Sequence, residues 1–257
     1  MLDQAIEQLP DSFRFSRDIL VRTDSAGCSQ GFLAHIRSLR EHDMRTFFSV
    51  GVAITEPVRE AIRTVQGWVP AIDPDGGFRE GAEVCELTGL VPDDAYPEGT
   101  RFIVRRERPH PGAQLSLFDT VEGMRHQVFA TDTPAGGGSI QFLEARHRAH
   151  ARVEDRIRCG KTTGFGRFPS RQFAINQAWL LLALVAIDLI AWTQHLLLDG
   201  ELAKAEPKKL RYRLLHVAAR ITRTARQTRV RVPQHWPWAT ATVAAFTRLA
   251  ALPRPAY

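Results

Sequence analysis

The chain is poor in cysteine. It has three, Cys28, Cys85 and Cys159, which are far apart and form no CxxC pair or Cys/His ligand spacing. This odd and scattered set argues against a zinc site or a disulfide framework, and it fits a reducing cytoplasm best. The opening residues, MLDQAIEQLPDSF, lack the charged start and apolar core of a secretory signal. We therefore expect a cytoplasmic protein.

The longest uninterrupted apolar run of the chain is too short to cross a bilayer. The most apolar segment is Ala178–Leu198, and its uninterrupted part ends at Ile187 because Asp188 follows. A membrane-spanning helix needs about 20 consecutive apolar residues. We expect a long buried helix over about Ser170–Leu198 and no membrane partner.

Acidic residues are scarce in the second half of the chain. Residues 145–257 hold 20 Lys or Arg against 6 Asp or Glu, a net charge of +14, whereas residues 1–144 hold 14 against 22, a net of −8. A hydrophobic content of 44% is ordinary for a soluble globular protein. A basic half joined to an acidic half suggests a polyanion partner such as DNA, and a merely solvated basic surface is the alternative.

The first half begins with a pattern typical of an α/β sheet. We expect a strand at Asp18–Thr23, a helix at Gln30–Glu41, a strand at Arg45–Ile54 and a helix at Thr55–Val65. Asp24 follows the first strand and precedes small residues and a helix. Open α/β sheets bind ligands at this position, although an aspartate there is also a common cap or turn residue.

The next segment predicts an antiparallel meander. Short alternating runs are separated by Pro, Gly and Asp clusters, and they cover Trp68–Ile72, Glu83–Leu87, Arg101–Arg106 and His126–Ala130. The third run leads into a basic, proline-stiffened loop. Its side chains Arg105, Arg106 and Arg108 are candidate phosphate contacts, and a solvated strand end is an equally good interpretation.

A basic helix is expected over Ile140–Lys161. On a helical wheel, Glu154 shares a face with His150, Arg158 and Lys161. A carboxylate that holds a divalent cation, surrounded by cations that hold phosphates, suits an enzyme acting on phosphodiesters. The alternative is a solvated face with ion pairs along the helix.

Two more helices complete the expected architecture: a basic amphipathic one at Lys208–Arg226 and a closing one at Ala239–Leu252. We expect an α/β fold in four parts. Residues 1–66 form the first half of a core, 67–139 a β-strand insertion, 140–200 the second half of the core with the basic helix, and 201–257 an all-helical basic region.

Three segments, LVRTDSAG, VRRERPHPG and ARVEDRIRCGKTTG, occur in an order that resembles the catalytic domain of the DDE transposases of bacterial insertion sequences. The resemblance implies an RNase H-like core with a β-strand insertion. It also implies DNA as partner, both transposon ends and target. Three acids would bind two Mg²⁺ (or Mn²⁺) ions that activate water and then a DNA 3′-hydroxyl. By position, Asp24 matches the second acid and Glu154 the third.

The chain departs from that family in two places. A Tyr-x2-Arg-x3-Glu-x6-Lys signature becomes His147-x2-His150-x3-Glu154-x6-Lys161. Only 23 residues precede Asp24, too few for the strands that carry the first acid. We therefore expect an amino-terminally truncated transposase that is inactive as a single chain.

Other functions stay open at this stage. One is a non-catalytic DNA-binding or inhibitory remnant of a transposase, and another is an interaction protein whose basic half meets an acidic partner. A metal-independent nuclease with His147 or His150 as general base is a weaker alternative. A transposase dimer, or a separate chain that supplies the missing acid, is compatible with the sequence.

Overall fold

The computed structural model describes residues 1–253. These residues form two compact units, Met1–Ala151 and the part from Arg152 onward. The boundary between the two units lies inside the segment Ile140–Lys161, where a basic helix was expected.

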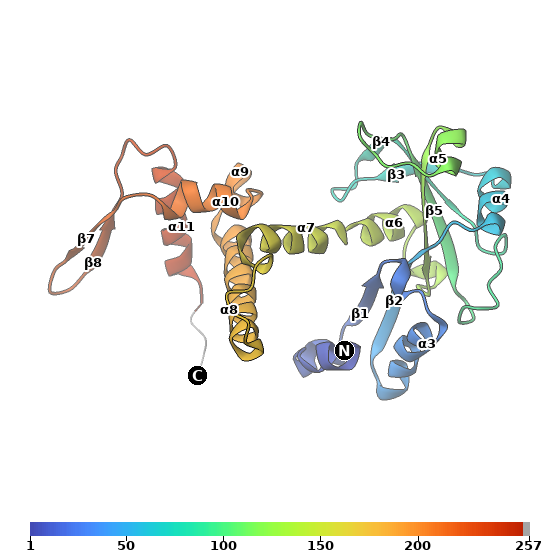
Figure 1. The fold of residues 1–257 in the computed structure, drawn as a ribbon, viewed down its shortest axis with the longest axis horizontal. Helices are drawn as coiled ribbons and strands as arrows, with labels where there is room; N and C mark the ends of the chain where they lie inside the picture. The colour runs from blue at the N-terminus through green and yellow to red at the C-terminus, as the bar shows by residue number, and fades with distance from the viewer. Residues whose placement is uncertain (254–257) are drawn as a thin grey trace. The chain divides into compact units, whose positions relative to one another are not determined.

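The first unit is built on a six-stranded sheet with the strand order β1-β2-β6-β5-β4-β3 (Figure 1). Its strands are β1 (Asp18–Thr23), β2 (Arg45–Val52), β3 (Val69–Ile72), β4 (Phe78–Glu86), β5 (Arg101–Glu107) and β6 (Arg125–Thr131). Its helices are α1 (Leu2–Glu7), α2 (Asp11–Arg14), α3 (Gln30–Ser38), α4 (Glu56–Thr64), α5 (Leu117–Glu122) and α6 (Ile140–Arg148).

The predicted βαβ unit at the start of the chain is confirmed. β1 and β2 are parallel, with Asp18 opposite Arg45 and Thr23 opposite Val50, and α3 connects them. The short apolar run of β1 and the alternation of β2 produce these strands. β1 is half-buried rather than fully buried because it lies at the edge of the sheet.

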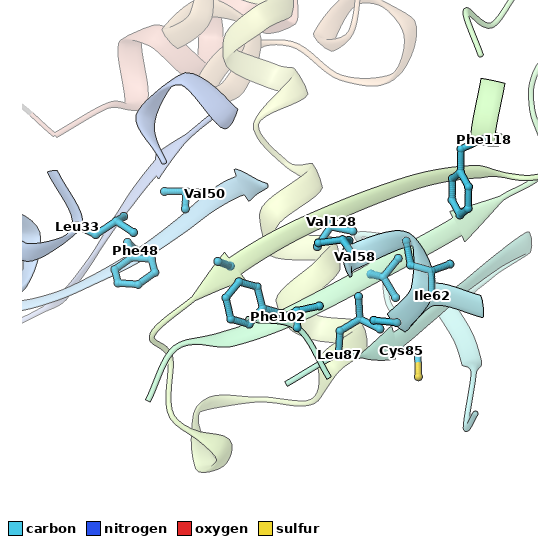
Figure 2. Packing of buried hydrophobic residues seen from close by; sticks show 14 of the residues in the cluster. Leu33, Phe48, Val50, Val58, Ile62, Cys85, Leu87, Phe102, Phe118 and Val128 are labelled. Carbon is cyan, nitrogen blue, oxygen red and sulfur yellow. The ribbon is translucent and has the colours of Figure 1, made fainter. Parts of the chain in front are cut away.

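The predicted meander is confirmed as well, but it forms no sheet of its own. β3, β4, β5 and β6 pair antiparallel in sequence, and β6 then pairs with β2. The strands expected as an insertion thus extend the sheet of β1 and β2. One apolar core joins both parts: Phe48 of β2 belongs to the same cluster as Phe102 of β5 and Val128 of β6 (Figure 2).

The two faces of the sheet carry different helices. Leu33 of α3 and Ile62 of α4 pack into the cluster that contains Phe102. α6 packs through Leu143 against Ile103 and Phe129, and neighbouring strand residues such as Phe102 and Ile103 point to opposite faces. α6 is therefore held on the face opposite α3 and α4.

The second unit is mainly helical. It contains α7 (Ala151–Gly160, whose first residue ends the first unit), α8 (Phe173–Trp192), α9 (Gly200–Ala203), α10 (Pro207–Leu210), α11 (Ala239–Ala251) and the strands β7 (Arg220–Arg223) and β8 (Thr228–Arg231). Its small core gathers Leu198, Leu202 and Leu210 against Trp238. The predicted closing helix is confirmed as α11.

Two expectations for this unit are corrected. The helix predicted over Lys208–Arg226 ends near Leu215, and an antiparallel hairpin of β7 and β8 follows, so the basic region is not all-helical. The β-branched residues Ile221, Thr222, Thr228 and Val230 favour strands in this segment. The basic helix at 140–161 is also interrupted, at Ala149–His150, between α6 and α7.

The apolar helix α8 is exposed within its unit, where we expected it to be buried. Its apolar side chains lie all round it, and Leu182 is 68% exposed. Phe173–Leu197 is long and apolar enough to cross a membrane by length and composition, which for one helix is weak evidence.

Candidate active site

Asp24 directly follows β1 and opens a tight turn. Its Oδ1 accepts a hydrogen bond from the backbone N–H of Ala26 at 3.0 Å, which caps the short 3₁₀ helix Ser25–Gly27. The side chain is exposed, and Oδ2 accepts no hydrogen bond from residues 1–253. The capping role considered from the sequence is thus present, and one carboxylate oxygen stays free for a ligand.

Two glycines allow the backbone around this turn to pack closely against its neighbours. A Cβ on Gly27 would lie 2.1 Å from Oγ1 and 2.5 Å from Cβ of Thr23, the residue before Asp24. A Cβ on Gly51 of β2 would lie 3.0 Å from the Ser25 nitrogen and 3.3 Å from the Asp24 carbonyl carbon. The carboxyl end of β1 is therefore packed too tightly for larger residues at either position.

The C-terminal end of α6 lies beside the end of β1. Arg22, two residues before Asp24, donates from Nη1 to the carbonyl oxygen of Arg146 at 3.0 Å. Arg146 in turn donates to Oγ1 of Thr133 at 2.7 Å. The first of these bonds ties the last turn of α6 to β1, the strand that Asp24 directly follows.

His147 secures the same turn from the inside. Its Nδ1 lies 2.8 Å from Oγ of Ser49, and its ring stacks on Phe129 with 4.4 Å between centroids. Burial, together with the nearby charges of Arg22 and His150, lowers the pKa of His147 to about 3. The imidazole is neutral and enclosed, so its geometry favours a structural role over a DNA contact or a general base. His150 is half-buried in the turn after α6.

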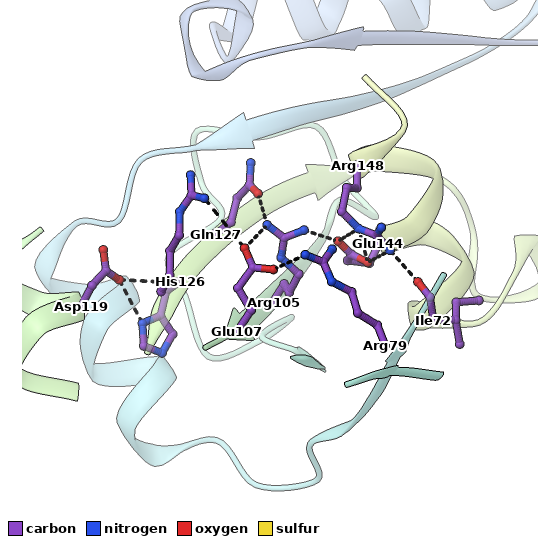
Figure 3. Close-up of polar contacts among 10 residues, drawn as sticks. Ile72, Arg79, Arg105, Glu107, Asp119, His126, Gln127, Glu144 and Arg148 are labelled. Carbon is purple, nitrogen blue, oxygen red and sulfur yellow. Dashed lines mark hydrogen bonds and ion pairs between the residues drawn. The ribbon is translucent and has the colours of Figure 1, made fainter. Parts of the chain in front are cut away.

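Arg105, a candidate phosphate contact, is part of a buried charge network (Figure 3). Its guanidinium donates to Glu144 of α6 at 2.9 Å, to Glu107 at 3.1 Å and to Gln127 at 2.8 Å. The side chains of Arg105 and Glu144 are 7% and 3% exposed. Burial lowers the pKa of Arg105, and the two carboxylates oppose that shift. This placement gives Arg105 the role of anchoring α6 rather than contacting a phosphate.

The two other arginines of this strand end differ in accessibility. Arg106 is half-buried, pairs with Glu83 at 2.7 Å and lies over the Trp68 ring at 4.1 Å from its centroid. Arg108 is exposed and pairs with no carboxylate of residues 1–253. Arg108 thus has a free guanidinium, whereas Arg106 would have to leave Glu83 to bind a phosphate.

Glu154 lies on α7 in the second unit. It is exposed and forms no ion pair with the residues that the structure describes. Arg158, expected to neighbour it, pairs instead with Asp155 at 2.6 Å and Glu206 at 3.1 Å, and these carboxylates raise its pKa. Lys161 is exposed in the π-helical turn that continues α7.

α7 itself is fixed within the second unit by a close helix crossing. A Cβ on Gly160 would lie 2.7 Å from the Phe165 ring and 2.8 Å from Cδ1 of Ile187 on α8. Asp24 belongs to the first unit and Glu154 to the second. Among residues 1–253, no three His, Cys, Asp or Glu side chains gather closely enough to hold a metal ion.

A mixed six-stranded sheet that begins with a βαβ unit and carries an acid at the end of its first strand is consistent with an RNase H-like catalytic domain. The family described as transposase DDE domain group 1 matches residues 1–254. The chain therefore belongs to this family of transposases, whose members act on DNA and generally use divalent metal ions. No curated protein matches the chain.

Sequence reasoning missed the residues that position the site. Glu144 lies in the predicted basic helix, yet its burial against Arg105 follows only from the face that α6 turns to the sheet. Gly27 is one of the small residues that follow Asp24, and a larger residue there would collide with Thr23. Helical spacing within residues 140–161 places Glu144 on the same side of the helix as His147, three residues later, and this is the signal that indicates a shared face.

Proposed function

We propose that this chain is a transposase catalytic-domain polypeptide in which Asp24 and Glu154 supply two of the carboxylates of a divalent-metal site. The observation that carries the proposal is the hydrogen bond between Arg22 and the Arg146 carbonyl, because it joins the end of β1 to the end of α6. Asp24 follows Arg22 by two residues, and Glu154 follows Arg146 by eight.

Chain connectivity limits how far Glu154 can lie from the first unit. It comes three residues after Ala151, the last residue of that unit. Three fully extended residues span at most about 11 Å. The Cα atom of Glu154 therefore lies within about 11 Å of that of Ala151.

The chemistry of both side chains suits the ion. Mg²⁺ prefers oxygen ligands. Neither carboxylate forms an ion pair with a side chain of residues 1–253. When bound, such ions would supply activation of the attacking oxygen and stabilisation of the leaving oxygen in a phosphodiester displacement. Arg108, His150 and Lys161 are the side chains that we propose for DNA contacts. Arg106 and Arg158 are further candidates once they are released from their carboxylate partners.

We further propose that the polypeptide of residues 1–257, assayed alone, does not cut or join DNA. Only two of the three acids of the family site are assigned, and losing a ligand lowers metal affinity or activity by about 10–100-fold. The test is incubation of purified protein with Mg²⁺ or Mn²⁺ and duplex DNA carrying an insertion-sequence end. Cleavage or joining that disappears in Glu154→Gln would contradict this part of the proposal.

A second candidate is a non-catalytic DNA-binding or inhibitory protein. The net charge of +14 over residues 145–257 favours it. A gel shift whose affinity falls steeply with salt, and which is the same with and without Mg²⁺, would support this function. Metal-dependent strand cleavage would contradict it.

A further inference from the structure

The last 51 residues of the chain carry positive charge and no acidic side chain. After Glu206 the sequence has 11 Lys or Arg and no Asp or Glu. Five of these arginines lie on the hairpin of β7 and β8 and its connecting turn Thr224–Gln227. The hairpin is thus a concentrated positive surface that the candidate active site does not use.

The pairing of the two strands places three of the arginines on one face. Arg220 is directly opposite Arg231, and Thr222 is opposite Arg229. Residues two apart on a strand share a face. Arg220, Arg229 and Arg231 therefore project from the same side of the ribbon, which we call the arginine face. The opposite side carries the pair Ile221 and Val230 and the pair Arg223 and Thr228.

Nothing in the described chain neutralises this face. All five hairpin arginines are exposed, and none pairs with a carboxylate of residues 1–253. Arg229 donates only to Oε1 of Gln227, at 2.8 and 3.0 Å. Like charges directly opposite each other destabilise a hairpin, and a two-stranded ribbon alone is only marginally stable. An anion placed between Arg220 and Arg231 would relieve this repulsion.

The surroundings of that pair leave room for such an anion. Arg220 and Arg231 line a hollow of about 380 Å³ together with Ala218, Ala219 and Pro233. The remaining lining is small or apolar, so no side chain there competes for the guanidinium groups. Arginine forms paired hydrogen bonds with phosphate oxygens, and a two-stranded β-ribbon fits the major groove of B-form DNA.

We propose that the β7–β8 hairpin is a second DNA-binding element, which enters the major groove of duplex DNA and grips the phosphate backbone with its arginine face. This inference rests on the proposed function, because it takes DNA as the substrate. It names a contact surface distinct from Asp24 and Glu154 and independent of metal.

The test is duplex binding by the full chain in EDTA, as a function of salt. Replacing Arg220, Arg229 and Arg231 with Gln removes up to three phosphate contacts. Each contact contributes about 0.9 to the slope of log affinity against log salt concentration. We expect the slope to fall by about 2 to 3 and the affinity at 0.1 M salt to fall by about 100-fold or more. The triple Arg→Lys variant should keep most of the slope because it keeps the charge.

A matched control removes the same charge elsewhere. Arg14, Arg59 and Arg63 each pair with a carboxylate in the first unit, and their triple Gln variant should bind DNA almost as the parent does. Equal slopes for the parent and the hairpin variant would overturn the inference while leaving the proposed function intact. A parent chain that binds no DNA at all would overturn the proposed function as well.

Two further measurements use the unmodified protein. Duplex DNA should protect the hairpin arginines from modification by phenylglyoxal, as read by mass spectrometry of the peptide around Arg229. Duplexes with bulky substituents at cytosine C5, which fill the major groove, should bind more weakly. Preferential competition by single-stranded DNA or polyglutamate, or unprotected hairpin arginines, would show that duplex DNA is not the partner of this surface.

Discussion

The buried pair of Arg105 and Glu144 should contribute more to the stability of the first unit than any exposed ion pair of the sheet. The Glu144→Gln variant keeps the size of the side chain and removes its charge. Arg105 would then share one remaining carboxylate, that of Glu107, with Arg79 and Arg125, and Arg148 would lose its ion pair with Glu144. The result is an excess of buried positive charge beneath α6.

The expected loss of stability follows from the burial of this pair. The side chain of Arg105 is 7% exposed and that of Glu144 is 3% exposed, so solvent screens little of the interaction. Removing one partner of a buried pair costs about 3–5 kcal/mol. Glu83→Gln is the matched control. Glu83 pairs with Arg106 of the neighbouring strand, and their side chains are 38% and 33% exposed, respectively. An exposed pair of this kind contributes at most about 1 kcal/mol.

Native-state hydrogen exchange of the amides of β5 and β6 is the appropriate assay, because it reports the opening free energy of the first unit alone. We expect Glu144→Gln to lower that free energy by about 3 kcal/mol or more, and the Arg105→Met/Glu144→Gln double variant to lower it by less than the sum of the single changes. A loss below about 1 kcal/mol for Glu144→Gln, equal to that of Glu83→Gln, would refute this reasoning.

Two further predictions concern the same unit. The unfolded chain binds a proton at His147 near pH 6.5, whereas the folded protein resists it down to about pH 3. Stability should therefore fall by about 2 kcal/mol between pH 7.5 and pH 5, and urea titrations of His147→Gln should show a correspondingly smaller loss. Equal losses would contradict the burial of a neutral imidazole. Gly27→Ala should cost about 1–3 kcal/mol because rotating Thr23 cannot move its Cβ away. Gly31→Ala on α3, with open space around it, should be neutral or stabilising by hydrogen exchange. Similar values for both glycine variants would contradict the packing around Asp24.

Much of the sheet could be predicted from the sequence because its signals are local. The runs that became β1, β2 and the meander strands alternate or are continuously apolar, and Pro and Gly clusters separate them. Their union into one sheet depends on the pairing of β2 with β6, residues 49–52 with 128–131, and no local pattern encodes that contact.

The helical half shows where sequence periodicity fails. Lys208–Arg226 contains apolar residues at helical spacing, yet a hairpin forms from Arg220 onward, where β-branched residues such as Ile221 and Val230 favour strands. For the candidate site, the position of Asp24 after β1 was predictable from the strand that precedes it. The separation of Asp24 and Glu154 into two units, and the burial of Arg105, depend on tertiary packing.

The most direct test of the account asks whether Asp24 and Glu154 hold the same ion. Fe²⁺ replaces Mg²⁺ at oxygen-rich sites, and with ascorbate and peroxide it cleaves the polypeptide next to the ligands that hold it. A shared metal site predicts cuts near residue 24 and near residue 154, both suppressed by Mg²⁺ and both lost in either Asp24→Asn or Glu154→Gln. Cuts near only one of the two positions, or cuts near one that survive substitution of the other, would contradict a shared metal site.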